Sequence, residues 1–314
     1  MRYINFSKFS GQGNDFIIID ATKEEIKLSR TLISKMCDRH FGIGADGLIF
    51  VRNSRVADFY MDYYNQDGST AEMCGNGIRC MADLILRKKL TNKPKIEIET
   101  LAGIKIVEAG LNSKTSAVQN IKVNMGSPVF EPGKIPVDIT KDTGFITKKS
   151  NINTTKNSNF VNSRINIKND KIINYPVLIK GNKFKINCLS MGNPHCVIFL
   201  DKNFNLEKIP VCSWGPVIEN HPIFPRKTNV EFVRVEDKNK ITIRVWERGV
   251  GETMACGTGA CAASVCSIEL GKVKESKVKV NLSGGFLKVY WEGKNFPVYL
   301  EGRVLHIFDG CYFF

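Results

Sequence analysis

The stretch CGNGIRCMADLILRKK (74–89) decides how this chain folds, because a stretch of the same kind, CGTGACAASVCSIELG (256–271), lies near its end. Each begins Cys-Gly-polar-Gly and continues into residues that are apolar on nearly all sides, which is typical of a helix buried inside a domain. The first ends in basic residues and the second at a glycine, and both are common helix ends. The sequence therefore predicts two central helices with Cys74 and Cys256 at their N-termini.

A cysteine at a helix N-terminus has a stabilised thiolate and is a better base than a free cysteine. One such cysteine in each half predicts a site between two similar domains. Either motif alone is equally compatible with a core cysteine beside a tight turn, because free cysteine packs as a small apolar residue. The repetition, and the polar residues around both copies, favour the functional interpretation.

We predict an α+β fold of two pseudo-symmetric domains, each a curved, mainly antiparallel sheet wrapped around a central buried helix. The predicted domains are 1–126, completed by 303–314, and 127–302, with a polar insertion at about 141–171. Residues 29–39 favour a short helix. Alternating patterns predict strands at 15–20, 47–51, 95–100, 103–107, 120–124, 196–200, 229–235, 240–246, 276–282, 287–291 and 297–301.

The composition excludes several classes of protein. No apolar run reaches the length of a membrane span, and the N-terminus has no signal or transit character, so we expect a cytoplasmic protein. None of the ten cysteines forms a CxxC pair or a zinc-ligand spacing, so we expect no metal. Much of the net charge of +14 lies in the polar tract, and no nucleic-acid motif accompanies it, so we expect no nucleic-acid partner.

One glycine motif is misleading. Gly42–Gly47 fits G-x-G-x-x-G, but a dinucleotide fingerprint needs a strand before it and a helix after it. Here a helical segment precedes the glycines and a strand follows them. The motif is therefore interpreted as a helix-to-strand turn.

Polar residues in turn-like settings surround the two cysteine motifs. Each alone is an ordinary turn former, but together they supply amides, one guanidinium and one carboxylate, which suits a zwitterionic small molecule. They are Asn14, Asn65, Asn193, His195, Asn229, Glu247 and Arg248.

Two cysteines facing one ligand can form a redox disulfide, bind a metal or exchange protons. Proton exchange needs a thiolate and a thiol on opposite faces of a carbon, and near neutrality one thiol of a coupled pair can ionise while the other keeps its proton. Backbone N–H groups of both helix entrances, Gly75-Asn76-Gly77 and Gly257-Thr258-Gly259, can bind a carboxylate and stabilise a carbanion-like state.

The chain resembles the diaminopimelate epimerase family through GNDF (13–16), NQDGSTAEMCGNGIRC (65–80), MGNPH (191–195), TNVEF (228–232) and ERGVGETMACGTGA (247–260). The resemblance implies an isomerase that is independent of pyridoxal phosphate, needs no cofactor and serves lysine and peptidoglycan precursor synthesis. It implies that Cys74 and Cys256 are the acid/base pair, adjusted by His195 and Glu247. The implied substrate-binding residues are Asn14, Asn65, Gly75, Asn76, Asn193, Asn229, Glu247, Arg248, Gly257 and Thr258. Some members carry Gln where this chain has Gly47, so a side-chain contact is lost there.

Three alternatives stay open. A proline or hydroxyproline racemase of the same fold would keep the thiol pair but change the recognition residues. In a thiol redox sensor or binding protein, Cys74 and Cys256 would simply become oxidised. A basic nucleic-acid-binding module is the least favoured alternative. The expected partner is a small molecule, diaminopimelate; no membrane partner is expected, and a homodimer is compatible with the sequence.

Overall fold

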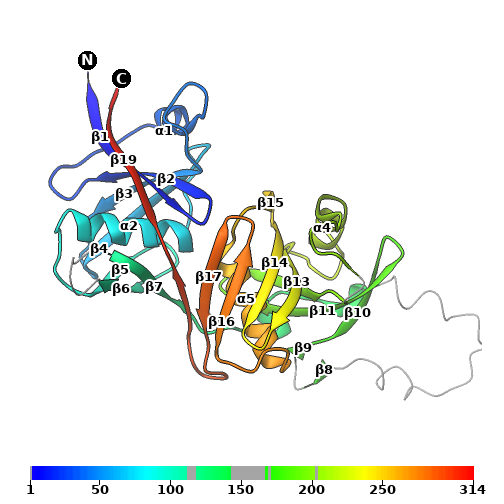
Figure 1. Ribbon diagram of the computed structural model, residues 1–314. Coiled ribbons are helices and arrows are strands. Elements are labelled where there is room, and N and C mark those ends of the chain that lie inside the picture. Colours follow the sequence, from blue (N-terminus) through cyan, green and yellow to red (C-terminus); the bar gives the residue numbers. More distant parts are fainter. Residues whose placement is uncertain (1, 112–117, 143–166, 169–170, 202–203) are drawn as a thin grey trace, which may run out of the picture. The chain divides into compact units, whose positions relative to one another are not determined.

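The computed structural model describes residues 2–111, 118–142, 167–168, 171–201 and 204–314 (Figure 1). The chain divides into two compact units, which are described separately. The first contains residues up to 125 together with 283–288 and 299–314, and the second contains 126–282 and 289–298. Most of the polar insertion predicted at about 141–171 lies outside the described residues.

The two units differ from the predicted domains at 283–288 and 299–302. The sequence predicts these segments in the second domain, and the structure has them in the first unit. These segments carry apolar side chains that pack in the first unit. Leu300 lies 3.4 Å from the position of a Cβ at Gly75, and Leu287 lies 2.6 Å from that of a Cβ at Gly302. The first unit is therefore completed by two returns of the chain before its last strand.

The first unit is a mixed sheet with two helices. Its helices are α1 (Arg30–Cys37) and α2 (Gly75–Arg87). Its strands are β1 (Tyr3–Gly11), β2 (Asn14–Asp20), β3 (Gly47–Arg52), β4 (Phe59–Asn65), β5 (Lys95–Glu99), β6 (Lys105–Leu111), β7 (Val118–Gly126), β18 (Val298–Gly302) and β19 (Leu305–Phe313). The last strand pairs antiparallel with β1, which places the two ends of the chain side by side (Figure 1).

The second unit has the same kind of sheet. Its helices are α4 (Val211–Glu219) and α5 (Gly257–Glu269), with short 3-10 turns η1 (Pro132–Lys134) and η2 (Ile139–Lys141). Its strands are β8 (Ile167–Lys168), β9 (Lys171–Ile172), β10 (Tyr175–Ile179), β11 (Asn182–Ser190), β12 (Pro194–Phe199), β13 (Asn229–Asp237), β14 (Lys240–Glu247), β15 (Gly251–Thr253) and β16 (Lys277–Leu282). Strand β17 (Gly285–Tyr290) begins in the first unit and ends in the second.

The two units repeat one topology. In the first, β1 and β2 pair antiparallel, β2 and β3 parallel, β3 and β4 antiparallel, and β4 and β5 parallel. In the second, β11, β12, β13, β14 and β16 pair in the same alternation. Helices α1 and α4 connect the first parallel pair of each unit, and α2 and α5 the second. The predicted pseudo-symmetric α+β fold is confirmed.

Each central helix is buried against its sheet. Every residue of α2 from Gly75 to Ile85 is buried, and α5 is buried from Gly259 to Ser267. Close approach depends on small residues: a Cβ at Gly77 would lie only 3.0 Å from Cδ1 of Ile49. The apolar face that contains Ile17, Ile19 and Phe50 packs instead with α1. No helix within the described ranges is long and apolar enough to cross a membrane.

Candidate active site

In the first unit, Cys74 is the N-cap residue of α2, as predicted. Its backbone is extended (φ −133°, ψ 122°), and the N–H of Gly77 donates to its Sγ at 3.4 Å. The thiol therefore takes the position that a serine or aspartate oxygen usually occupies. The N–H groups of Gly75 and Asn76 lie in the first turn, where a helix leaves its donors without intrahelical acceptors.

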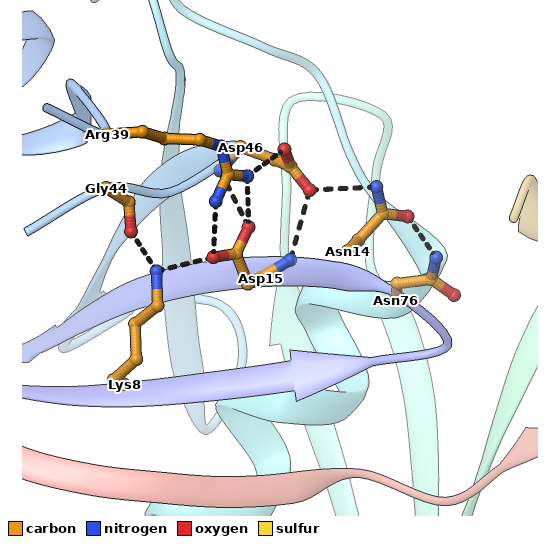
Figure 2. Close-up of polar contacts among 7 residues, drawn as sticks. All are labelled: Lys8, Asn14, Asp15, Arg39, Gly44, Asp46 and Asn76. Carbon is orange, nitrogen blue, oxygen red and sulfur yellow. Dashed lines mark hydrogen bonds and ion pairs between the residues drawn. The ribbon is translucent and has the colours of Figure 1, made fainter. Parts of the chain in front are cut away.

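Two predicted binding residues, Asn14 and Asn76, form a directed chain of hydrogen bonds at this helix entrance (Figure 2). The Nδ2 of Asn14 donates to Asp46 Oδ2 at 3.1 Å, and the Nδ2 of Asn76 donates to Asn14 Oδ1. The Oδ1 of Asn76 accepts from the buried Arg79 guanidinium at 2.7 Å. The Oδ1 atoms of both asparagines already accept hydrogen bonds. The groups at this entrance that remain for a ligand are therefore N–H donors. Donors suit a carboxylate.

A charged cluster fixes the outer end of this chain (Figure 2). Asp15 forms ion pairs with buried Lys8 and with Arg39, both at 2.7 Å, and Arg39 also pairs with Asp46 at 2.7 Å. Lys8 also donates to the carbonyl of Gly44. The segment Gly42–Gly47 runs from the end of α1 to the start of β3, so it is the predicted helix-to-strand turn, and Lys8 holds it in place. Burial raises the pKa of Asp15, but hydrogen bonds from Arg39 and Lys8 outweigh it and lower the pKa to about 2.

Replacing Asp15 by asparagine is expected to lower the free energy of unfolding by about 1–3 kcal/mol near neutral pH, because Lys8 stays buried without its carboxylate. The pKa of Asp15 is about 2 when folded, below the ordinary 3.8. Its stabilisation is therefore complete above the unfolded value and is lost as the pH falls through the folded value. Urea unfolding of both proteins at pH about 7, about 4 and about 2 should show the difference shrinking with acid. The exposed Glu25→Gln serves as the control; a difference independent of pH contradicts the assignment.

Asn65, the other predicted residue of this unit, ends β4. Its Nδ2 donates to Ser69 Oγ at 3.0 Å, and its backbone N–H donates to the Ser69 carbonyl at 2.8 Å.

At Gly47 a side chain is excluded, because a Cβ would lie 2.6 Å from both the Tyr63 ring and the Tyr64 carbonyl. The glycine that departs from the family pattern is therefore required by local packing.

In the second unit, Cys256 is the N-cap of α5 with nearly the same geometry (φ −123°, ψ 114°). The N–H of Gly259 donates to its Sγ at 3.4 Å. The expectation of a stabilised thiolate is wrong for this cysteine. Burial raises its pKa well above the usual value, and the Glu247 carboxylate raises it further. The Thr258 hydroxyl and the Gly259 N–H lower the pKa but do not overcome these effects, so the surroundings of Cys256 favour its thiol form.

His195 lies wholly buried on β12, and both of its ring nitrogens have a hydrogen-bond partner. Its Nδ1 is 2.7 Å from Glu231 Oε1, and its Nε2 is 2.9 Å from Asn193 Oδ1. The Nδ2 of Asn193 reaches the Thr258 hydroxyl at 3.4 Å, and that hydroxyl lies 3.4 Å from Cys256 Sγ. The structure thus links three predicted residues, His195, Asn193 and Thr258, to Cys256 in one hydrogen-bonded chain.

The remaining predicted residues of this unit gather at the end of β14. The Oε1 of Glu247 accepts from the Thr253 hydroxyl at 2.6 Å. Asn229 is buried; its Nδ2 donates to the Pro194 carbonyl and its Oδ1 accepts from the Arg248 backbone N–H at 3.0 Å. The Arg248 side chain is exposed and donates to the Arg226 carbonyl at 3.2 Å. Asn229 therefore fixes the backbone of Arg248, and the guanidinium of Arg248 lies at the surface of the unit.

The sequence interpretation missed three buried charged residues that support these groups. Arg79 donates to the Gly75 carbonyl at 2.9 Å beneath the first helix entrance. Glu231 holds His195, and Glu219 accepts from Trp246 Nε1 at 2.7 Å and from the Gly249 N–H at 2.9 Å. A charged residue within an apolar run, as Arg79 and Glu231 are, was the available signal.

Comparison with known proteins identifies the family of this chain. The family model described as diaminopimelate epimerase matches residues 6–131 and 187–307. A diaminopimelate epimerase from Leptospira biflexa is 42% identical over 309 residues, covering 98% of each chain. One from Acetivibrio thermocellus is 41% identical over 307 residues, again covering 98% of each chain.

Solved structures share the fold. A phenazine biosynthesis protein of the PhzF family from Bacillus anthracis has a TM-score of 0.67 at 17% identity, covering 100% of both chains. A hydroxyproline epimerase from Agrobacterium vitis has a TM-score of 0.64 at 10% identity, covering 99% of this chain and 92% of that one. These likenesses show the fold alone, whereas the family model covers most of the sequence. The chain belongs to the diaminopimelate epimerase family.

Proposed function

We propose that this chain is an isomerase that converts LL-diaminopimelate into meso-diaminopimelate, in lysine and peptidoglycan precursor synthesis, and that Cys74 and Cys256 carry the proton. The repeated cap carries the proposal: in each unit the Sγ of the N-cap cysteine accepts from the N–H three residues later at 3.4 Å. Family membership supports the same substrate.

The reaction balances without an oxidant or a cofactor. A thiolate removes the hydrogen from one face of Cα, so an S–H bond forms as a C–H bond breaks. The thiol of the other cysteine then gives its proton to the opposite face of the carbanion. The centre is inverted, and the two sulfurs have exchanged their protonation states. The reverse reaction starts from that exchanged state.

We assign the proton donor for the forward reaction to Cys256. The residue is only 5% exposed, and both burial and the Glu247 carboxylate favour the thiol. Cys74 is then the base. Its surroundings support this role, because the buried Arg79 guanidinium donates to the carbonyl of Gly75 and to Asn76 within the same helix turn.

The two helix entrances supply donors for the α-carboxylate. The first-turn N–H groups of Gly75, Asn76, Gly257 and Thr258 have no intrahelical acceptors. Donors aimed at a carboxylate stabilise the extra charge that it gains as Cα loses its proton. The Arg248 guanidinium, exposed at the end of β14, would bind the carboxylate at the far end of the substrate.

The proposal places the enzyme in a reducing compartment, the cytoplasm. None of the ten cysteines, all of them among the described residues, forms a disulfide, and the proposed chemistry requires Cys74 and Cys256 to stay reduced. Its partner is a small-molecule substrate. A homodimer and the absence of a nucleic-acid partner stay predictions, which light scattering and a salt-dependent binding assay can test.

The pure protein is expected to form meso-diaminopimelate from the LL isomer in D2O with a chelator present and no pyridoxal phosphate. Because the returned proton comes from a second sulfur, early product should carry deuterium at the inverted Cα while the remaining substrate keeps hydrogen. NMR of the reaction mixture measures both, with proline and hydroxyproline as alternative substrates. Activity that appears only after adding pyridoxal phosphate or a metal, or only with proline, contradicts the proposal.

A further inference from the structure

Three side chains, His195, Asn193 and Thr258, connect the buried carboxylate of Glu231 to the sulfur of Cys256, all within the second unit. Glu231 on β13 lies 2.7 Å from His195 on β12, and the other nitrogen of His195 lies 2.9 Å from Asn193. Asn193 reaches Thr258 at 3.4 Å, and Thr258 reaches Cys256 Sγ at 3.4 Å. Glu231 and His195 are both wholly buried, and Glu231 Oε2 accepts no hydrogen bond from the described residues. Such a carboxylate needs a cationic partner.

The chemistry of the atoms gives this chain a direction. Both nitrogens of the His195 ring lie within hydrogen-bond distance of an oxygen, one of Glu231 and one of Asn193, and a ring that carries a proton on both nitrogens satisfies both contacts. With its oxygen used by His195, Asn193 turns its NH2 group toward Thr258. The Thr258 oxygen then accepts from Asn193, and its own hydrogen is left to point at the Cys256 sulfur. The Nδ1–H of His195 points at Glu231, and each later donor in the chain, on His195 Nε2, Asn193 and Thr258, points toward that sulfur.

We propose that Glu231 is a positioning residue that orients the Thr258 hydroxyl toward Cys256 through His195 and Asn193, and so stabilises the thiolate that Cys256 becomes after giving its proton. The use of that thiolate in catalysis rests on the proposed function. The orientation itself does not, because the reactivity of Cys256 can be measured without any substrate.

Charge alone predicts the opposite effect for Glu231. The carboxylates that act on Cys256 are those of Glu247 on β14 and Glu231 on β13, and both disfavour its thiolate. As an isolated carboxylate, Glu231 would make Cys256 less reactive, and its removal would increase the reactivity. As the anchor of the chain, it keeps two protons on the His195 ring, and its removal weakens the last donor. The sign of one substitution therefore distinguishes the two roles.

The test is the rate at which iodoacetamide alkylates Cys256, followed against pH by peptide mass spectrometry. Thr258→Val removes the hydroxyl, and we expect the alkylation midpoint to rise by about one pH unit, a tenfold loss of rate at fixed pH. Thr258→Ser keeps the hydroxyl and should remain close to the native protein. Glu231→Gln should reduce the rate several-fold, because a neutral ring is a weaker donor than a charged one.

The double variant Glu231→Gln/Thr258→Val tests whether Glu231 acts on Cys256 through the Thr258 hydroxyl. If Glu231 acts through the hydroxyl, the double variant reacts as Thr258→Val does, with no further loss. A faster or unchanged Cys256 in Glu231→Gln, or a full additional effect in the double variant, overturns the proposal. Should Glu231→Gln not fold, nitrogen NMR of the native protein decides: both ring nitrogens of His195 protonated near neutral pH supports the chain, and an unprotonated Nε2 overturns it. Since no measurement uses diaminopimelate, an inactive enzyme would leave this outcome separate from that of the proposed function.

Discussion

Cys74→Ala and Cys256→Ala are each expected to abolish epimerisation, because each face of Cα needs its own proton carrier. A positioned acid or base contributes on the order of 10²–10⁴-fold to a rate, and neither alanine variant has a substitute on its face. The loss should appear in kcat and kcat/KM alike. Both cysteines cap buried helices through their sulfur, so thermal unfolding of each variant must accompany the kinetics.

Serine is the informative second substitution. Cys74→Ser and Cys256→Ser keep an N-cap acceptor, so they should preserve the fold while leaving little activity, since a hydroxyl is a far weaker acid than a thiol. Exposed Cys212 and Cys311 give matched controls, and their alanine variants should turn over normally. Near-native turnover in either Cys74→Ala or Cys256→Ala would end the two-base model.

The fold could be predicted where the local pattern was strong. Helices α2 and α5 were visible because each is apolar on nearly all sides and opens on a glycine turn, and strands such as β5 and β14 because their alternation is clean. Helix α4 was missed because Gly215 and Pro216 lie inside it. Its glycine is needed there, since a Cβ would lie 2.5 Å from the Trp246 ring. Strand β1 was missed because buried Lys8 interrupts its pattern, and that lysine is explained by its ion pair with Asp15 and its hydrogen bond to the Gly44 carbonyl.

The residues of the candidate site could be proposed from the sequence, but their electrostatic arrangement could not. A helix N-terminus favours a thiolate, and that local argument holds for the N–H of Gly259 on Cys256. It fails in total because burial and Glu247 act through tertiary structure, which no local pattern contains. The roles of Glu231 and Glu219 were hidden for the same reason, because each acts on residues of another strand or loop.

The turn that carries Arg248 is built to hold a guanidinium in a fixed place. The Arg248 N–H donates to Asn229, and the N–H of the next residue, Gly249, donates to buried Glu219 at 2.9 Å. Within the described residues the Arg248 side chain forms no ion pair and is exposed. A rigid backbone presenting an arginine without a carboxylate partner suits a ligand carboxylate, because the planar fork binds two oxygens at once.

Arg248→Lys is therefore expected to reduce kcat/KM for diaminopimelate by about 10- to 100-fold, the cost of losing a charge-assisted bidentate contact. The loss should fall mainly on KM, because the far carboxylate does not change during proton transfer. No activity with proline or alanine should appear, since lysine removes recognition without creating a smaller site. Arg226→Lys is the matched control, because Arg226 meets Arg248 only through its backbone carbonyl. Unchanged kinetics in Arg248→Lys, or an equal loss in Arg226→Lys, would assign the guanidinium to the surface, and the far carboxylate would then need another partner in this unit.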